Sequence, residues 1–309
     1  MAASTTTRAA TPSGWRSWLT SPRTTAAPAV LPTALGLPVV LWQAVFFAAP
    51  LCFLVIVTFW QVKSFRLEPA FVLDNWSRIL FSTPFQRALG HTLVVALTTT
   101  VLSVLIAFPA AYTIAMRLPT RLRDLAIAFL IVPVFSSYML RIYAWQIVLS
   151  PEGMTNSLLA SLGIGALPLL GGAFSLQVGL LTLTLPIAVL ILVFALSGID
   201  GTLIEAAENL GCRRSRVIAH IVLPAVRPAI TLAATTSFLL AFSDYISPLF
   251  MTGSKPPTLS ILIVDTVKSG SQWPRASVIG VAMLVILALV IGLGQWLASG
   301  RLSRRGGGA

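Results

Sequence analysis

The chain has 309 residues, of which 56% are hydrophobic and only 10% are charged, and its formal net charge is +12. A soluble domain carries about 25% charged residues, so this composition excludes soluble enzymes, soluble nucleic-acid-binding domains, coiled coils and disordered proteins. It predicts an all-α, polytopic membrane protein in which the excess of Lys and Arg lies in loops that set orientation and contact anionic lipid, with no nucleic-acid partner.

Six apolar stretches are long enough to cross a bilayer, which takes about 20 helical residues. They are predicted at residues 36–60, 91–116, 125–149, 176–196, 228–252 and 276–299. The Ala-, Thr-, Ser- and Pro-rich segment 1–35 is expected to be a disordered tail. The membrane domain is therefore placed at 36–299, and residues 300–309 form a second tail.

The distribution of Lys and Arg between the loops indicates the orientation. The two tails, the turn 117–124 and the segment 197–227 together hold thirteen, whereas the loops on the opposite side hold seven. Because cytoplasmic loops carry the excess of basic residues, both termini are predicted to be cytoplasmic.

The cytoplasmic segment 197–227 is more than a connector. Thr202 is followed three residues later by Glu205, the spacing of a capping box, which predicts a short helix over 203–210 with Thr202 as its cap. Gly211 is expected to end this helix in the left-handed conformation. A second, basic amphipathic stretch follows at 213–222. Patterning alone leaves open a plain amphipathic helix that rests on lipid.

Seven residues in this loop resemble the EAA motif of the membrane-spanning subunits of binding-protein-dependent ABC importers: Glu205, Ala206, Ala207, Gly211, Ile221, Leu223 and Pro224. The resemblance implies a coupling helix between the fourth and fifth spans that docks on cytoplasmic ABC ATPase subunits. It also implies a second permease subunit, related or identical, a periplasmic or lipid-tethered solute-binding protein, and a place in the bacterial inner membrane. The chain lacks the GxxxxGK[ST] pattern, so it is expected to be no enzyme and to bind no cofactor, with ATP and Mg used by the partner ATPase.

A second set of residues resembles the spermidine/putrescine permease family. It comprises Pro133, Arg141, Tyr143, Trp145, Gly153 and Asn156, with further likeness at 243–253 and 273–274. The resemblance implies a polyamine solute, although relatives carry other small organic solutes, anions or iron, and these stay open as alternatives.

Two ionisable residues, Arg141 and Asp244, lie inside predicted spans, each about 24 Å along its helix. Intramembrane charges usually face a cavity or each other. Three interpretations are open: a mutual ion pair, a place on the translocation pathway, or an Arg141 side chain that reaches the interface. The candidate pathway residues are Arg141, Tyr143, Trp145, Asp244 and Tyr245. Tyr138 is instead assigned to the aromatic belt at the membrane interface.

Two other functional classes are weighed against the importer. An ion-coupled secondary transporter needs several intramembrane acids as relays, whereas only Asp244 lies deep in a span. A membrane enzyme that acts on lipids needs clustered His, Asp or Glu at an interface, and the sequence shows no such cluster.

Overall fold

The computed structural model describes residues 38–63 and 66–299. The predicted tails 1–35 and 300–309 lie outside these residues. The chain divides into two compact units, residues 1–53 and 54–309, and each is described by itself.

A helix from Pro38 to Val57 contains the described part of the first unit and continues into the second. It includes the π-helical turn η2 (Ala44–Ala48) and α2 (Ala49–Val57). The π turn ends two residues before Pro50, whose ring and missing N–H interrupt the regular helical hydrogen bonds.

After α2, the second unit continues with a short antiparallel hairpin of β1 (Gln61–Lys63) and β2 (Arg66–Glu68), in which Val62 pairs with Leu67. The rest of the unit is helical, as predicted. Its helices are α3 (Asp74–Leu80), α4 (Thr83–Met116), α5 (Thr120–Phe135), α6 (Tyr138–Leu149), α7 (Met154–Ser161), α8 (Ala173–Ser197), α9 (Gly201–Asn209), α10 (Arg214–Val217), η3 (Ile218–Val222), α11 (Leu223–Ala225), α12 (Arg227–Ser243), α13 (Ile246–Met251), α14 (Leu259–Lys268) and α15 (Trp273–Ser299).

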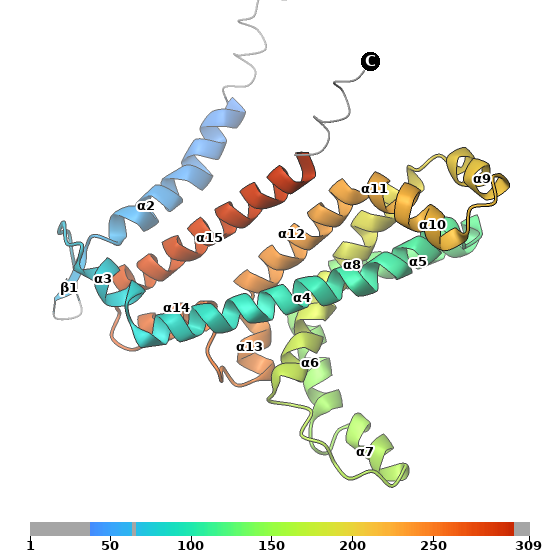
Figure 1. Ribbon diagram of the computed structural model, residues 1–309. Coiled ribbons are helices and arrows are strands. Elements are labelled where there is room, and N and C mark those ends of the chain that lie inside the picture. The colour runs from blue at the N-terminus through green and yellow to red at the C-terminus, as the bar shows by residue number, and fades with distance from the viewer. Residues whose placement is uncertain (1–37, 64–65, 300–309) are drawn as a thin grey trace, which may run out of the picture. The chain divides into compact units, whose positions relative to one another are not determined.

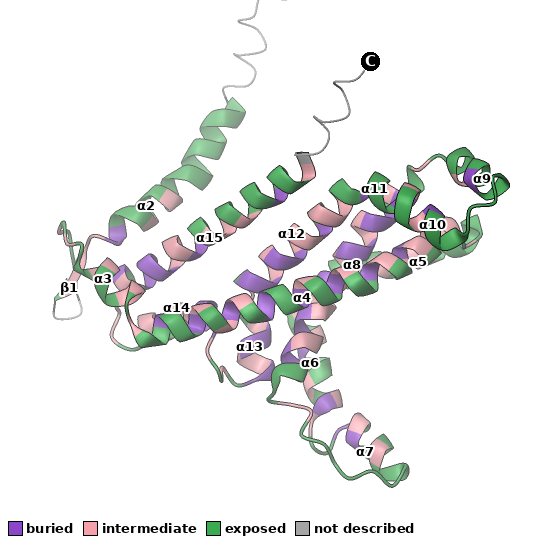
Figure 2. Ribbon diagram, viewed as in Figure 1, coloured by how far each residue is buried: buried purple, intermediate pink, exposed green. Residues whose placement is uncertain are grey.

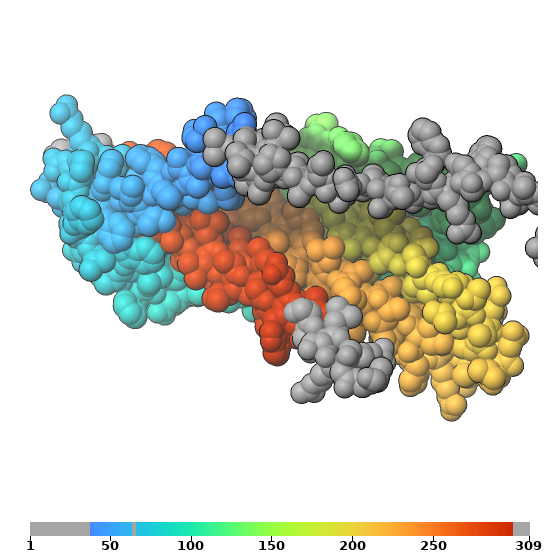
Figure 3. All heavy atoms as spheres, turned by 90° about the horizontal axis from the view of Figure 1, so that it is seen from above, coloured from blue at the N-terminus to red at the C-terminus, as the bar shows by residue number. Residues whose placement is uncertain are grey.

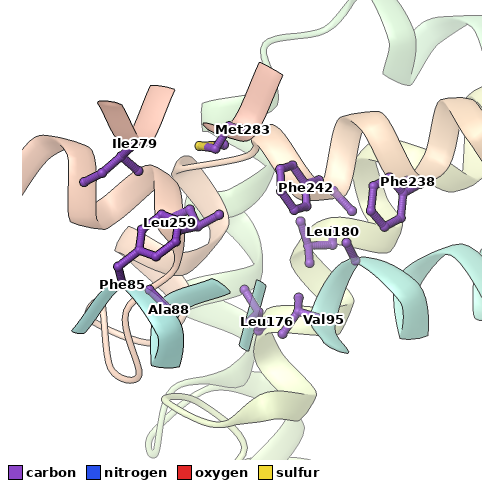
Figure 4. Close-up of a cluster of buried hydrophobic side chains, with 12 residues drawn as sticks. Phe85, Ala88, Val95, Leu176, Leu180, Phe238, Phe242, Leu259, Ile279 and Met283 are labelled. Carbon is purple, nitrogen blue, oxygen red and sulfur yellow. The ribbon is translucent and has the colours of Figure 1, made fainter. Parts of the chain in front are cut away.

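The core of the second unit lies where α4, α8 and α12 pack together, with α14 and α15 along one side (Figure 1). Buried residues are concentrated on these helices (Figure 2). One cluster joins side chains of all five helices, among them Phe85, Leu180, Phe242, Leu259 and Ile279 (Figure 4).

Small polar side chains also join α4 to α8. The Ser103 and Thr184 hydroxyls lie 2.6 Å apart, and the Thr99 hydroxyl donates to Gln177 Oε1 at 2.8 Å. Interhelical hydrogen bonds of this kind contribute to helix association inside a membrane, where burial of apolar surface gives little driving force.

Two of the six predicted spans are broken. Between α5 and the helical segment Tyr138–Ser161 the chain bends by 95° at Ser136 and Ser137, so the third span predicted over 125–149 is not one continuous helix. The fifth predicted span, 228–252, is interrupted at Asp244 and Tyr245 between α12 and α13. The estimate that placed Arg141 24 Å along a continuous helix therefore fails, because that helix ends before Arg141.

The described residues form four unbroken helices long and apolar enough to cross a membrane: Pro38–Val57, Thr83–Met116, Ala173–Ser197 and Trp273–Ala298. The number rises to six if each of two bent helix pairs is one span; these pairs are Thr120–Phe135 with Tyr138–Ser161, and Arg214–Ala225 with Arg227–Ser243. The protein is thus an all-α, polytopic membrane protein with four to six candidate spans. Within the described residues, the only strands are those of the short β1–β2 hairpin.

Candidate functional site

The loop that carries the EAA-like residues folds as a helical hairpin, here called the EAA hairpin (residues 198–226). It consists of α9, a turn at Gly211, and the nearly continuous helical run α10–η3–α11. In the space-filling view it forms one end of the second unit, opposite the end that carries β1 and α3 (Figure 3). Helix α8 ends at Ser197, so only three residues separate it from α9.

The N-terminus of α9 is capped by Asp200, not by Thr202 as predicted. The Asp200 Oδ1 atom accepts a hydrogen bond of 3.0 Å from the Thr202 backbone N–H. This bond, with a second from the Thr202 side chain, holds the pKa of the exposed Asp200 carboxyl below its ordinary value. Asp200 takes the place of Thr202 because Asp is at least as good a cap as Thr and because Asp200 lies nearer the end of α8.

The C-terminus of α9 confirms the prediction for Gly211, whose φ is +78°. The Gly211 N–H donates to Glu208 O at 2.9 Å, and the Cys212 N–H donates to Ala207 O at 3.1 Å. This pair of bonds is the Schellman motif, which satisfies carbonyls that the helix end leaves free. The turn therefore has a defined geometry that reverses the chain toward α10.

The inner side of the EAA hairpin packs on the membrane helices. Ala207, Val217 and Val222 are buried, and Val222 belongs to a cluster with Leu196 of α8 and Ala111 of α4. A shallow pocket of about 190 Å³ separates the two arms. Its lining residues are Ala207, Cys212, Arg216, Val217, His220 and Ile221. The hairpin is thus fastened to helices that enter the membrane.

The outer side of α9 and its C-cap, Leu210, carry a row of exposed apolar side chains. Leu203 is 57% exposed and Leu210 is 85% exposed, and with Ala206 they have the i, i+3, i+7 spacing of one helix face. The Glu205 side chain lies exposed beside this row. The motif did not point to Leu203 or Leu210, although the hydrophobic pattern of residues 203–210 contains both.

The seven motif residues therefore divide by position. Ala207 and Gly211 build the EAA hairpin, and Ile221 is half-buried in its pocket. The other four are exposed: Glu205, Ala206, Leu223 and Pro224.

A second group of polar side chains lies where the two broken spans meet α8. We call Tyr138, Arg141, Asp244 and Ser247 the break cluster. The Tyr138 hydroxyl donates to Asp244 Oδ2 at 2.9 Å and is also hydrogen-bonded to Ser247 Oγ. The Asp244 carboxylate further accepts the backbone N–H groups of Ile246 and Ser247, both at 3.0 Å. Asp244 thus accepts the first N–H groups of α13, and Tyr138 is a half-buried hydrogen-bond partner of this acid.

Arg141 and Asp244, both within the described residues, form no ion pair with each other. The Arg141 Nη1 atom donates instead to the backbone carbonyl of Thr182 in α8 at 2.7 Å, and the guanidinium carbon lies 5.5 Å from the centre of the Tyr138 ring. The mutual ion pair weighed from the sequence is therefore wrong. The two charges share a neighbour, Tyr138, but each has its own partners.

The three aromatic candidates lie near this cluster in sequence and remain partly open. Tyr143 and Tyr245 are each 41% exposed, and Trp145 is 36% exposed. The Tyr143 ring packs on Phe250 of α13, with ring centres 5.0 Å apart. The geometry thus brings α6 and α13 together and leaves aromatic faces accessible on α6 and at Tyr245, just before α13.

The two remaining motif residues of the 131–159 stretch have structural roles. The Asn156 side chain donates to Ser150 O and Leu167 O and accepts from Leu167 N, which ties the loop between α6 and α8 together. A Cβ atom at Gly153 would lie 2.6 Å from Val148 O, so only glycine fits there. Within residues 38–63 and 66–299, no three His, Cys, Asp or Glu side chains are grouped to hold a metal ion.

Residues 103–302 match the family described as binding-protein-dependent transport system inner membrane component. The spermidine/putrescine transport system permease protein PotB of Escherichia coli (strain K12) is 28% identical over 241 residues, which cover 77% of this chain and 86% of that protein. The inner membrane ABC transporter permease protein YdcU of the same organism is 25% identical, covering 81% of this chain and 84% of that protein.

Among solved structures, the fold is shared with a chain in the crystal structure of a bacterial alginate ABC transporter in complex with an alginate pentasaccharide-bound periplasmic protein. The TM-score is 0.69 at 18% identity, and the match covers 87% of this chain and 94% of that one.

Proposed function

This chain belongs to the family of binding-protein-dependent transport system inner membrane components, so it is a multi-pass permease subunit of a bacterial ABC importer, and we propose that its solute is a polyamine such as spermidine or putrescine. The polyamine proposal rests on the likeness to PotB and, within the chain, on one observation: a carboxylate, Asp244, at a helix break in the membrane domain. Six spans with both termini in the cytoplasm are part of the proposal.

The chemistry around the break cluster suits a polyamine. An ammonium group can pair with the Asp244 carboxylate, and a methylene chain with further ammonium groups can lie along aromatic faces through cation–π contacts. Tyr143, Trp145 and Tyr245 supply such faces. We therefore propose that these residues, with Arg141 beside them, mark the translocation pathway.

The EAA hairpin is proposed as the coupling helix. Its exposed row, Leu203, Ala206 and Leu210, is an apolar anchor of the kind that fills a groove on a partner, and Glu205 adds a charge at its edge. Because the hairpin is fastened to α8, movement of the ATPase can pass into the membrane as a rigid-body displacement. ATP and Mg are used by the ATPase subunits, a second permease completes the pathway, and a solute-binding protein delivers the solute on the outer side.

The solute is tested in proteoliposomes that contain the complete importer with its binding protein. We expect uptake of labelled spermidine or putrescine that a neutral or anionic solute does not inhibit. Asp244→Asn should lower uptake strongly, whereas Asp265→Asn, which alters an exposed acid of α14, should leave it unchanged. Transport of an anion without transport of a polyamine would reject the proposed solute.

The coupling role is tested by co-purification of the ATPase in detergent. Glu205→Lys and Gly211→Asp should lose the ATPase while the permease stays folded. Glu152→Lys reverses an exposed acid in the loop between α6 and α7 and should retain it. Full retention in all three variants would reject the EAA hairpin as the docking element.

The orientation is tested with the thiols already present. Cys212 is exposed on the EAA hairpin. In a Cys52→Ser background, a membrane-impermeant maleimide added to intact spheroplasts should leave Cys212 unlabelled but label a cysteine placed at Glu68. The reverse pattern would show that the proposed topology is inverted.

A further inference from the structure

A proline in α8 changes what Arg141 can bind. In an α-helix the N–H of residue i donates to the carbonyl of residue i−4. Pro186 lies inside α8 and has no N–H, so the carbonyl of Thr182 loses its helical donor. Because an unsatisfied carbonyl is costly where no water reaches it, another donor is required. Arg141 Nη1 supplies one, at 2.7 Å.

The same guanidinium shares a neighbour, Tyr138, with Asp244. Both side chains contact Tyr138, the arginine over the ring and the carboxylate at the hydroxyl. With Thr182 O as its acceptor and the Tyr138 ring beneath it, the guanidinium forms no ion pair with Asp244. The partners of Asp244 are a hydroxyl and two backbone N–H groups, none of which carries a positive charge.

We infer that Pro186 and Arg141 are positioning residues for solute binding: the Thr182 carbonyl, freed by Pro186, holds the Arg141 guanidinium away from Asp244 and keeps that carboxylate free for an ammonium group of the solute. The inference rests on the proposed function, because it requires a cationic solute at Asp244. In this arrangement Arg141 is not a ligand of the solute. Its guanidinium stays bound to the Thr182 carbonyl, which Pro186 leaves without a helical donor.

Replacing Pro186 tests the inference, since Pro186→Ala returns an N–H to Thr182 O and releases Arg141. If the released guanidinium pairs with Asp244 in about nine molecules of ten, the apparent affinity for a cation falls about tenfold. We expect this loss in equilibrium binding of labelled spermidine to the purified importer without its binding protein. Pro186→Gly also returns the N–H and should behave alike.

The double variant Arg141→Met/Pro186→Ala distinguishes a role of Pro186 in positioning Arg141 from a role of Pro186 that depends only on a kink in α8. Arg141→Met alone leaves the Thr182 carbonyl unsatisfied and should lower the melting temperature of the complex. Combined with Pro186→Ala, the carbonyl is satisfied and no guanidinium competes, so both spermidine affinity and melting temperature should return toward wild type. An affinity loss in Pro186→Ala that persists with Met at 141, or no loss at all, would overturn the inference.

A control and a solute-independent measurement complete the design. Pro109→Ala removes an interior proline of α4 and should leave spermidine affinity unchanged. The thermal coupling between Arg141→Met and Asp244→Asn should be larger in the Pro186→Ala background than in wild type, whatever the solute. If the wild-type importer binds no spermidine but this coupling appears, the proposed solute is wrong and the positioning stands. If spermidine binds and the coupling is unchanged, only the positioning fails.

Discussion

Replacing Gly211 with alanine isolates the conformational contribution of the turn in the EAA hairpin. The φ of +78° is left-handed, and a Cβ atom built there meets no atom within 4 Å. The cost is therefore one of backbone conformation alone, about 1–2 kcal/mol for a residue with a side chain in this region. A cost of that size multiplies the population of the open hairpin about 5- to 30-fold.

Hydrogen exchange measures this opening directly. The Gly211 and Cys212 amides donate the two bonds of the Schellman motif, so in Gly211→Ala the Cys212 amide and that of the new residue should exchange faster by the same factor. Gly211→Asn should exchange nearly as wild type, because Asn tolerates the left-handed region. Gly201→Ala is the matched control, since its surroundings are also open but its φ is not left-handed. Equal exchange in Gly211→Ala and Gly201→Ala, or equal damage from Ala and Asn, would refute the reasoning.

Three further predictions concern other parts of the chain. Asp200→Ala should weaken ATPase retention, whereas Asp200→Asn should preserve it. Because the cap lowers the pKa of the Asp200 carboxyl, the stabilisation that this carboxylate gives α9 is complete above the ordinary pKa and is lost as the pH falls through the lowered value. Titration of ATPase retention at acid pH checks this. Gly179→Ala should destabilise the complex by about 1–3 kcal/mol, since the new Cβ lies 3.0 Å from the buried Ser247 hydroxyl, whereas Gly292→Ala, which has open space, should not change the melting temperature; equal values would contradict the packing argument. Asn156→Leu should expose the loop between α6 and α8 to limited proteolysis, and unchanged cleavage would show that its three hydrogen bonds do not hold the loop.

The regular parts of the membrane helices could be predicted from the sequence because they depend on long apolar runs. The predicted span 176–196 differs from α8 by three residues at one end and one at the other. Helix α4 begins eight residues before the predicted start at residue 91, at a signal present in the sequence: Ser82 caps the helix and Pro84 occupies its first turn. Hydropathy alone passes over such a polar beginning.

The breaks could not be predicted in the same way. Ser136, Ser137, Asp244 and Tyr245 are short polar interruptions in apolar runs, and whether a membrane helix continues through them depends on partners elsewhere in the chain. At Asp244 those partners include Tyr138, more than 100 residues earlier. Residue type singles out Asp244 and Arg141 as charges inside predicted spans. It does not identify Tyr138 or the carbonyl of Thr182 as their partners, which only the three-dimensional arrangement shows.

The hydrogen bonds between α4 and α8 have a mechanical consequence. The Ser103–Thr184 and Thr99–Gln177 hydrogen bonds lie about two turns apart along α8. Sliding α4 past α8 would therefore break both bonds at once. Two hydrogen bonds thus oppose sliding of α4 past α8, so we expect the two helices to move together when the EAA hairpin moves. The shorter α6 and α13 lie outside this pair of bonds, because they follow α5 and α12 across the chain breaks at 136–137 and 244–245.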